Sequence, residues 1–579
     1  MSKNSNQDLK RKKDIGQFFT PQVVVEFIYD VLKIQLEKEG RWTRGKFPSV
    51  MDPACGEGIF LKVALDKKIT KPRYVFGVDI DDDVKNKWTR INLPKAFKSK
   101  AKLEVHFYHQ NSLLPLPKKA LRYKSGGLGQ YDLVVGNPPY GGVGFKEIDS
   151  KLEDALLGFE IWKRAGDLDR KSQSELFDGS YIERLGEKRK ERLEKFPIEI
   201  LFIDKFIQLT KPGGHIAIII PDGILSNSNL HYVRKFISEK MKVNAIVSLP
   251  RETFKGVGTS AKTSILFMTK PREDEKTADN YKIFLASVER SEYLNKVYEH
   301  YKEVNEMNSS IKDLVKVIND SQGNEVAMVR VDKTLGDMIE EKPSSRFDPQ
   351  YWHIKFQNLL SNISSKYKIN LLGEFVDFIT YGQVGSRIYS KRGTVRYIQT
   401  INITDTGIDY YIKEAFIDEG SHNDPDRSKL KYEDVLLGNA GMGGLGKCTI
   451  FLTKNDKVNI SQDIDILRLK NINPYYASIF LKSIFGNAQI WIRSKGVGAP
   501  KLPFDEIKAI KIPKLPVNVQ KNIEIEHKKM SIHHFKAMEA KAKGDEFNYK
   551  KNLKVAERML KDLIARTEAV IIGEKEDII

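Results

Sequence analysis

The sequence of 579 residues predicts an α/β fold in which a parallel sheet carries helices on both faces, followed by a mixed α+β domain and a C-terminal helix. Three segments carry this prediction. Val50 to Phe60 is typical of strand, glycine turn and helix, Tyr74 to Asp79 of a strand that ends in an acid, and Tyr131 to Gly136 of an apolar strand followed by Asn137. Short apolar runs that end in polar residues are typical of buried parallel strands, whose carboxyl ends form the binding crevice.

The first strand leads into a glycine turn and the second ends in Asp79. Gly56 and Gly58 lie where a backbone must come close to a ligand, and Asp79 follows about 20 residues later. A carboxylate at this spacing binds ribose hydroxyls in nucleotide-binding α/β folds, so Asp79 is the predicted ribose ligand. The acids at 81–83 are predicted to cap a helix, and no metal site is expected.

The third strand ends in Asn137-Pro138-Pro139-Tyr140. The side-chain carbonyl of Asn137 and the main-chain carbonyl of Pro138 can both accept hydrogen bonds from one exocyclic amino group, while Tyr140 stacks on its ring. Two acceptors held out of the ring plane would draw the amine nitrogen toward tetrahedral geometry and free its lone pair for attack. A two-proline turn after a structural strand is the alternative interpretation.

Together these motifs resemble the DNA amino-methyltransferases that use S-adenosylmethionine, and their order resembles the gamma class. Gly16-Gln17-Phe18-Phe19-Thr20-Pro21 precedes the glycine turn, and a long C-terminal region follows Asn-Pro-Pro-Tyr. TaqI-like members of this class methylate adenine at N6 in type II restriction-modification systems. The resemblance covers about Ile15 to Lys270 and implies a Rossmann-like methyltransferase sheet, S-adenosylmethionine as cofactor and double-stranded DNA as substrate.

The resemblance also implies roles for individual residues. The implied catalytic residues are Asn137, Pro138, Pro139 and Tyr140. Phe254 would stack on an adenine flipped out of the duplex, from the side opposite Tyr140. The implied cofactor-binding residues are Thr20, Pro21, Asp52, Ala54, Gly56, Gly58, Asp79, Ile80, Asn111 and Asn137. Asn111 stands where the family usually has an Asp, which removes the charge-assisted part of a hydrogen bond to the cofactor's adenine amine.

Composition agrees with a nucleic-acid partner. The formal charge of +19 and the pI near 9.3 favour a polyanion, although a basic solvated surface is the alternative. No apolar run approaches the roughly 20 residues of a membrane helix, and the N-terminus has no signal-peptide pattern. Cys55 and Cys448 are the only cysteines, which fits a reducing cytoplasm and excludes a Cys-rich zinc site. We therefore expect a cytoplasmic protein without a membrane segment.

Changes in composition predict the domains. Residues 1–335 are predicted to form the catalytic domain, with a charged helical insertion at about 141–197 that has little to bury and a polar connection at 271–333. The short strands of 336–519, together with the segment at 345–352, resemble the target-recognition domain of type I restriction specificity subunits. Residues 520–579 form a helical C-terminal segment, in which Gln520 to Ile571 is predicted to be one long basic helix like the spacer helices of those subunits.

Gly441 to Cys448 in the recognition domain has the spacing of a phosphate-binding loop. We reject ATP binding, because Cys448 replaces the Ser or Thr that binds magnesium and a strand is predicted to follow. The glycines either let a loop approach DNA, with Lys447 on a phosphate, or form a structural turn. The predicted DNA-binding residues are Arg387, Arg392, Arg396 and Lys447. His533 and His534 are expected at the surface.

These interpretations combine into a site-specific methyltransferase that transfers a methyl group to N6 of a flipped-out adenine in duplex DNA. A single recognition domain favours a monomer or loose dimer, and a cognate restriction endonuclease would act on the same site without a stable complex. Three alternatives stay open. They are a catalytic subunit that needs a partner, a non-catalytic DNA-binding protein, and an amino-methyltransferase of RNA or protein.

Overall fold

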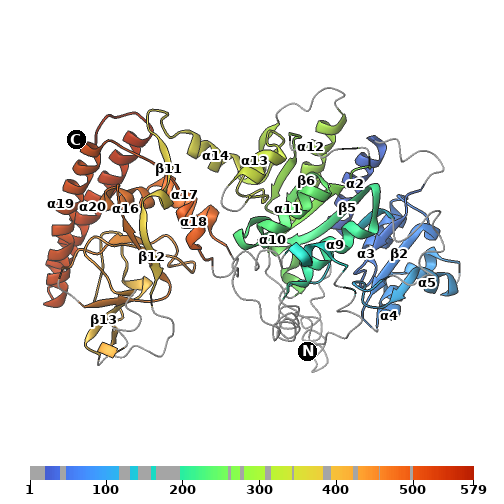
Figure 1. Ribbon diagram of the computed structural model, residues 1–579, viewed down its shortest axis with the longest axis horizontal. Helices are drawn as coiled ribbons and strands as arrows, with labels where there is room; N and C mark the ends of the chain where they lie inside the picture. The colour runs from blue at the N-terminus through green and yellow to red at the C-terminus, as the bar shows by residue number, and fades with distance from the viewer. Residues whose placement is uncertain are drawn as a thin grey trace, which may run out of the picture. The chain divides into compact units, whose positions relative to one another are not determined.

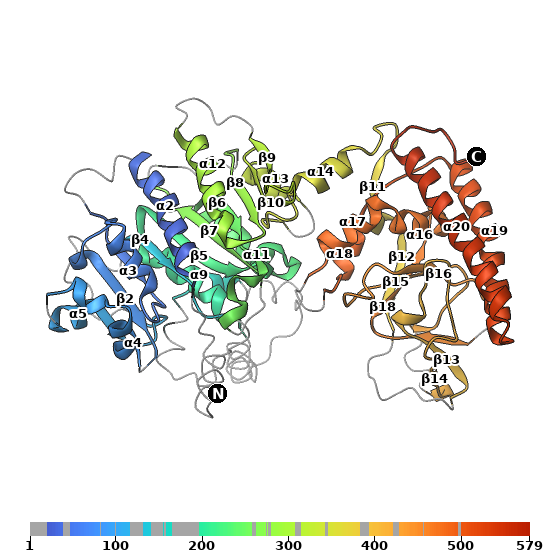
Figure 2. The same ribbon diagram turned by 180° about the vertical axis from the view of Figure 1, so that it is seen from behind.

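A computed structural model describes residues 20–38, 47–81, 83–98, 100–115, 131–140, 155, 158–164, 196–257, 262–273, 275, 280–306, 314–341, 345–382, 393–420, 428–454, 457–495 and 500–579. The chain divides into two compact units, Met1–Trp352 and His353–Ile579. Figures 1 and 2 show the elements of each unit from opposite sides. Within the described residues, no helix is both long enough and apolar enough to cross a membrane.

The first unit is built on a mixed sheet with the strand order β3-β2-β1-β4-β5-β7-β6-β8-β10-β9 (Figure 1). Strands β1 to β5 pair in parallel, and β7 runs antiparallel between β5 and β6. The bounds are β1 (Val50–Asp52), β2 (Val75–Asp79), β3 (Phe107–His109), β4 (Tyr131–Gly136), β5 (Thr210–Pro221), β6 (Lys242–Ser248), β7 (Thr263–Thr269), β8 (Phe284–Val288), β9 (Val315–Asn319) and β10 (Glu325–Arg330).

Helices cover both faces of this sheet. Side chains alternate along a strand, and in β4 Leu133 and Val135 join the apolar cluster of α2, α3 and α12, whereas α9 also packs on β4 and β5. The expected Rossmann-like sheet with helices on both faces is therefore confirmed. The helices of the unit are α2 (Gln22–Lys38), α3 (Ile59–Asp66), α4 (Val84–Arg90), α5 (Lys100–His106), α9 (Ile198–Leu209), α10 (Asp222–Ser226), α11 (His231–Lys240), α12 (Leu294–Glu306) and α13 (Leu335–Glu340).

The expectation for one polar segment of this unit is wrong, and the few described residues of another are more buried than expected. The supposed connection at 271–333 forms β8, α12, β9 and β10, because the fully buried β8 pairs in parallel with β6 and so extends the sheet. In the charged insertion, Phe159, Ile161 and Trp162 are buried, and the Ile161 N–H donates to Asp204 Oδ2 on α9 at 3.0 Å. Most of that insertion lies outside the described residues.

The first unit extends beyond the expected boundary at residue 335. Arg234 Nε donates to the Ser345 carbonyl at 2.7 Å, and the Phe347 N–H donates to the Leu225 carbonyl at 2.9 Å. Arg330 donates to the carbonyl of Trp352. The segment at 345–352 was expected at the start of the recognition domain, but these hydrogen bonds make it part of the first unit.

The second unit contains three small sheets, β11-β19, β12-β18-β15-β16 and β14-β13-β17, among the described residues. Its strands are β11 (Ile369–Leu371), β12 (Val376–Tyr381), β13 (Val395–Ile398), β14 (Phe416–Ile417), β15 (Val435–Gly438), β16 (Cys448–Ile450), β17 (Val458–Ile460), β18 (Ile464–Leu469) and β19 (Lys511–Pro513). Its helices are α14 (Ile354–Ser361), α16 (Pro474–Lys482), α17 (Ile484–Arg493), α18 (Phe504–Lys508), α19 (Val517–Ala542) and α20 (Glu546–Ile571).

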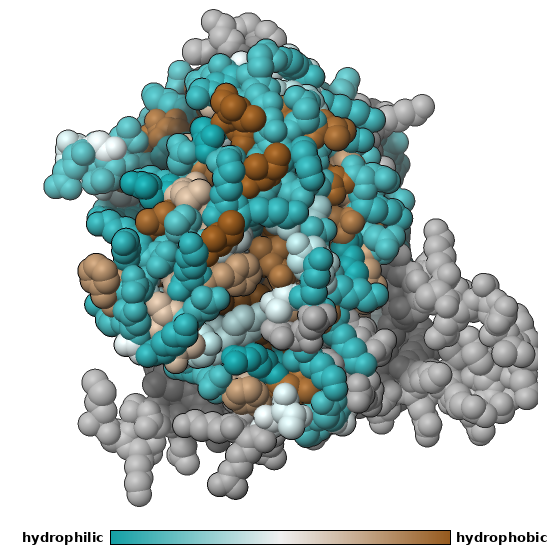
Figure 3. Space-filling view, turned by 90° about the vertical axis from the view of Figure 1, so that its left-hand side faces the viewer, coloured by the Kyte–Doolittle hydropathy of each residue, from teal (hydrophilic) through white to brown (hydrophobic). Residues whose placement is uncertain are grey.

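The C-terminal region is a pair of helices, so the prediction of one long helix is wrong. Gly544 has φ +71 in the turn after α19, and the Asp545 side chain caps α20 by accepting from the Asn548 N–H at 3.0 Å. The two helices lie side by side in both ribbon views (Figures 1 and 2). On the side of the unit that bears them, hydrophobic residues are mostly separate spots on a hydrophilic surface (Figure 3).

Candidate active site and cofactor site

Asp52, Asp79 and Asn137 lie at the carboxyl ends of neighbouring parallel strands, which form one edge of the sheet along the ends of its strands. Strands β1 and β4 are parallel neighbours, and the strand order runs in opposite directions on their two sides, which makes this the topological switch point. Asp52 ends β1, Asp79 ends β2 and Asn137 follows β4. The structure thus brings together side chains that the sequence predicted at the carboxyl ends of separate strands.

The glycine turn between β1 and α3 is held by hydrogen bonds to both strands. The Ala54 N–H donates to Asp52 Oδ1 at 3.0 Å, and the Gly56 N–H donates to Asp79 Oδ2 at 2.6 Å. Gly56 and Gly58 have φ +49 and +86, a region that residues with a Cβ rarely adopt. The glycines are therefore required by the turn itself as well as by the approach of a ligand.

Asp79 keeps acceptor capacity for a ligand. Its Oδ2 accepts from Gly56 and its Oδ1 from the Asp81 N–H at 2.9 Å, which uses one lone pair of each oxygen. Burial raises the pKa of Asp79, and these main-chain hydrogen bonds lower it. Ile80 beside it is 56% exposed and offers apolar surface. An acceptor pair next to exposed apolar surface fits a ribose that carries a purine.

Asn111 is connected to the same edge through its neighbour. The Gln110 N–H donates to the Asp79 carbonyl at 2.9 Å, and Asn111 Oδ1 accepts from the Leu113 N–H at 3.0 Å. One lone pair of the amide oxygen thus stabilises the local turn, and the other can accept a hydrogen bond from a ligand. Its predicted role beside the cofactor's adenine stays a prediction.

The side chain of Asn137 is oriented by Thr20. Asn137 Nδ2 donates to Thr20 Oγ1 at 3.2 Å, which fixes the amide so that Oδ1 points away from Thr20. Thr20 is buried and Pro21 half-buried, directly before α2. This contact joins the N-terminal motif to the end of β4, as expected if both belong to one site.

Tyr140 is buried beside Asn137. Burial raises the pKa of its hydroxyl well above the ordinary value, a hydrogen bond with the Asn137 side chain lowers it, and the charge of Glu199 raises it. The phenol is therefore neutral at physiological pH. Pro138 is buried and Pro139 half-buried between the two.

Phe254 lies in the 3-10 helix η5 (Arg251–Val257), after β6. Its ring is fully buried in the apolar cluster that contains Val247 and Leu249. Stacking on a base would require one face of this ring to be uncovered. The proposed stacking role therefore stays a prediction, and in this structure Phe254 is a core residue.

Two groups at this edge escaped the sequence analysis. Asp222 follows β5 and accepts from Ser264 Oγ at 2.7 Å; burial raises its pKa to about 6, and the charge of Lys262 opposes the shift. An acid directly after an apolar strand is the signal that identified Asp79, so it could have identified Asp222. Glu199, in the first turn of α9, gave no such signal, and burial raises its pKa.

Gly136 allows β4 to pass close to Asp52. A Cβ at this position would lie 2.6 Å from Asp52 Oδ1, a distance that atoms do not tolerate without movement. The residue directly before Asn137 must therefore be a glycine for the two strand ends to meet. Within the described residues, no cluster of three or more His, Cys, Asp or Glu side chains could hold a metal ion.

Known protein families match this unit. The family N-6 DNA Methylase matches residues 180–333, and the family Eco57I restriction-modification methylase matches residues 65–254. The methylase subunit of the type I restriction enzyme EcoEI from Escherichia coli is 26% identical over 281 residues, which cover 46% of this chain and 44% of that protein. The type II methyltransferase M.HincII from Haemophilus influenzae is 26% identical over 254 residues, 44% of this chain and 37% of its own length. The first unit is thus similar, at low identity, to N6 DNA methylases of restriction-modification systems.

A third similar protein has no assigned activity. It is the uncharacterized protein YtxK from Bacillus subtilis, 27% identical over 248 residues, which cover 42% of this chain and 57% of that protein. The chain thus spans about half the length of the curated relatives that it matches. The match to the N-6 DNA Methylase family supports S-adenosylmethionine as the expected cofactor, and the glycine turn with Asp79 and Ile80 fits its nucleoside.

The structure describes two of the four predicted DNA-binding residues of the second unit, Arg396 and Lys447. Arg387 and Arg392 lie outside the described residues. Arg396 pairs with Glu414 at 3.3 Å, and its guanidinium lies 5.1 Å from the centre of the Tyr410 ring. Lys447 Nζ donates to the Thr400 carbonyl at 3.3 Å, and β16 rather than a helix follows the glycine turn, as the rejection of ATP binding assumed.

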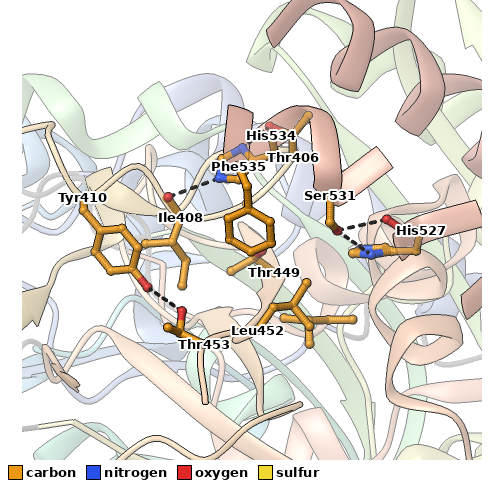
Figure 4. A pocket seen from close by; sticks show the side chains of 12 residues that line it. Thr406, Ile408, Tyr410, Thr449, Leu452, Thr453, His527, Ser531, His534 and Phe535 are labelled. Atoms are coloured by element: carbon orange, nitrogen blue, oxygen red, sulfur yellow. Dashed lines mark hydrogen bonds between the residues drawn. The ribbon is translucent and has the colours of Figure 1, made fainter. Parts of the chain in front are cut away.

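His534 is buried, so the expectation that it lies at the surface is wrong. Its Nδ1 contacts Thr406 Oγ1 at 3.0 Å and its Nε2 the Ile408 carbonyl at 3.2 Å, so the ring bridges α19 to the loop before β14 (Figure 4). Thr406, Ile408 and His534 line a small cavity. His527 lines the same cavity and contacts Ser531. Burial lowers the pKa of His527 to about 3, so both rings are neutral structural groups near neutral pH.

Proposed function

We propose that this protein is a site-specific DNA methyltransferase of a restriction-modification system, which methylates N6 of an adenine flipped out of double-stranded DNA. One observation carries the proposal. Asn137, which follows β4 directly after the Gly136 that approaches Asp52, has its amide oriented by Thr20 of the N-terminal motif. An amide fixed in this way, followed by the carbonyl of a proline, is an acceptor pair suited to one planar amine.

The methyl group comes from the sulfonium of S-adenosylmethionine, and the residues of this chain prepare the amine that receives it. Asn137 Oδ1 and the Pro138 carbonyl accept the two hydrogens of the N6 amine and hold its lone pair in line with the methyl group. Thr20 keeps Asn137 Oδ1 pointed at the amine by accepting from Nδ2. Tyr140, neutral because burial raises its pKa, adds an aromatic face without charge.

The target adenine must leave the base stack to reach Asn137. Extrusion of a base costs a few kcal/mol, and stacking on an aromatic side chain recovers roughly 1–3 kcal/mol. Tyr140 on one side and Phe254 on the other would offset most of that cost. Because Phe254 is fully buried in this structure, the stacking role requires its turn to move when the base enters.

The second unit, His353–Ile579, is proposed to recognise the target sequence. The net charge of +19 supports a polyanionic partner, and Arg387, Arg392, Arg396 and Lys447 stay candidates for base or phosphate contacts. With recognition and catalysis in one chain, the protein would work as a monomer or loose dimer, and a cognate endonuclease would be a separate protein.

A second function is favoured by the relatives' names. Methylase subunits of type I enzymes, which are parts of larger enzymes by their printed names, are among the relatives. A catalytic subunit that acts only with a partner is therefore the competing proposal. It differs from the first in one respect that can be measured, because such a subunit would leave no methylation mark when it is expressed alone.

Long-read modification mapping tests the proposal. Genomic DNA from a methylation-deficient host that expresses the protein should carry N6-methyladenine in one sequence motif, and the variant Asn137→Ala should leave that motif unmodified. Equal modification by Asn137→Ala would refute the role of the amide. A folded, cofactor-bound protein that leaves no mark would favour the partner-dependent subunit or an RNA or protein substrate.

A further inference from the structure

A glycine-rich turn in the second unit presents an apolar side chain to solvent. The turn Gly441–Gly446 connects β15 to β16, and Met442 in it is 65% exposed. Leu445 of the same turn is buried in the apolar core of the unit. One hydrophobic residue therefore anchors the turn, and the other is displayed outward.

Main-chain hydrogen bonds fix both ends of this turn. The Gly441 N–H donates to the Pro500 carbonyl at 2.8 Å, and the Gly446 N–H donates to the Gly438 carbonyl at 2.9 Å. Within the turn, the Leu445 N–H donates to the Gly441 carbonyl at 2.9 Å. Met442 is thus held outward on an ordered backbone, which reduces the conformational entropy lost when it enters a binding partner.

Among the described residues, neither backbone conformation nor lack of space explains why position 443 is a glycine. Gly441 and Gly446 have φ +79 and +80, and a Cβ at Gly444 would lie 2.6 Å from the Ala440 carbonyl oxygen. Gly443 is outside the left-handed region, and a Cβ there would meet no atom within 4 Å among the residues that the structure describes. A missing side chain next to an exposed Met leaves room for something that approaches the backbone closely.

The charges around the turn favour an anionic partner. Lys447 ends the turn half-buried, and the exposed Lys501 forms a β-bridge with Ala440 at its start. The exposed Asp463, whose carbonyl accepts from the Asn439 N–H, is an acid close by. A second acid, Asp465, is buried and interacts with Lys501, and burial raises its pKa to about 7. The exposed charges around Met442 are therefore Lys501 and Asp463, with the half-buried Lys447 beside them, and this balance suits a phosphate backbone next to an apolar contact.

We propose that Met442 is a wedge that enters a groove of the DNA and inserts between adjacent base pairs of the recognition site, with Gly443 letting the backbone reach the sugar edge. This proposal rests on the proposed function. Proteins that kink DNA insert Met and other apolar side chains between base steps in this way. The unbranched thioether of Met adapts its shape to such a gap.

The test compares Met442→Ala and Gly443→Ala with the wild type on a duplex that carries the motif found by modification mapping. Met442→Ala should weaken binding roughly tenfold to a hundredfold, since a Met side chain would lose its burial. Gly443→Ala should weaken binding while the melting temperature is unchanged, because its Cβ meets open space in the free protein. Ile532→Ala, at a 53% exposed position on α19, is the matched control and should bind like the wild type.

2-Aminopurine placed in turn along the duplex reports where bases unstack. The wild type should raise the fluorescence at one step besides the target adenine, and Met442→Ala should abolish that second signal alone. If the wild type binds and methylates the duplex but both variants bind as tightly, or if no second step responds to Met442, the wedge is refuted and the proposed function stands. If the wild type neither binds nor methylates DNA, the proposed function itself is refuted.

Discussion

The contact between Thr20 and Asn137 makes a sharp prediction about catalysis. Thr20→Val retains a branched side chain of similar size but removes the Oγ1 that accepts from Asn137 Nδ2 at 3.2 Å. A buried N–H without an acceptor costs about 1–3 kcal/mol, and a bond at the long end of the normal range lies near the lower limit. A loss of about 1–1.5 kcal/mol in the orientation of Oδ1 would slow methyl transfer roughly 5- to 12-fold.

Single-turnover transfer of labelled methyl groups at saturating cofactor measures this rate, with Thr20→Ser as the control because it keeps the hydroxyl. We expect the Ser variant to transfer within about twofold of the wild type. An unchanged rate in Thr20→Val, or an equal loss in Thr20→Ser, would contradict the orienting role. A higher cofactor Kd by calorimetry with a normal saturated rate would instead assign Thr20 to cofactor binding alone.

Three further predictions concern stability and cofactor binding. Gly136→Ala places a Cβ 2.6 Å from Asp52 Oδ1, so it should lower the melting temperature and weaken cofactor binding together in calorimetry; a normal variant would show that β4 can move. His527 has a folded pKa of about 3 against an ordinary value of 6.5, so the unfolded chain binds the extra proton as the pH falls below 6.5. Denaturant titrations should show a loss of up to about 1.4 kcal/mol per pH unit between those values, and His527→Gln should flatten that dependence. Arg234 is fully buried and donates to the carbonyls of Ser345, Ile224 and Asn227, so Arg234→Met should lower the free energy of unfolding by about 3 kcal/mol, whereas a change at the exposed Arg290 should be neutral.

The strand ends of the first unit were predictable from sequence because their signals are local. Val75 to Asp79 and Tyr131 to Gly136 are short apolar runs that end in a polar group, and a parallel sheet brings such ends to one edge. The order of the strands is not local. The placement of β7 between β5 and β6 depends on which edges remain unpaired, and that is decided only when the whole sheet assembles.

The wrong expectations share a cause. Polar segments were expected to be exposed, but contacts with residues distant in sequence bury parts of them. The segment that forms β8, β9 and β10 contains many charged residues, yet β8 is buried because β6 offers an unpaired edge. His534 gives no local sign of burial, because its ring meets Thr406 and Ile408 from a loop more than 100 residues away in sequence. The turn at Gly544 did carry a local signal, which is a glycine followed by an Asp that caps the next helix. The prediction of one helix missed it because the helical pattern continues on both sides of the turn.

The electrostatics of the carboxyl edge connect the cofactor to the chemistry. Burial is the largest cause of the raised pKa of Asp52 and of Asp79, and the charge of Asp79 raises that of Asp52 further. A ligand with positive charge would therefore stabilise the ionised form of both carboxylates. S-adenosylmethionine carries a sulfonium cation that becomes a neutral thioether when the methyl group leaves, so ionised carboxylates at this edge would favour the charged cofactor over its demethylated product. In their ionised form the same carboxylates would repel phosphates, which is in keeping with phosphate contacts on basic surface elsewhere on a chain whose net charge is +19.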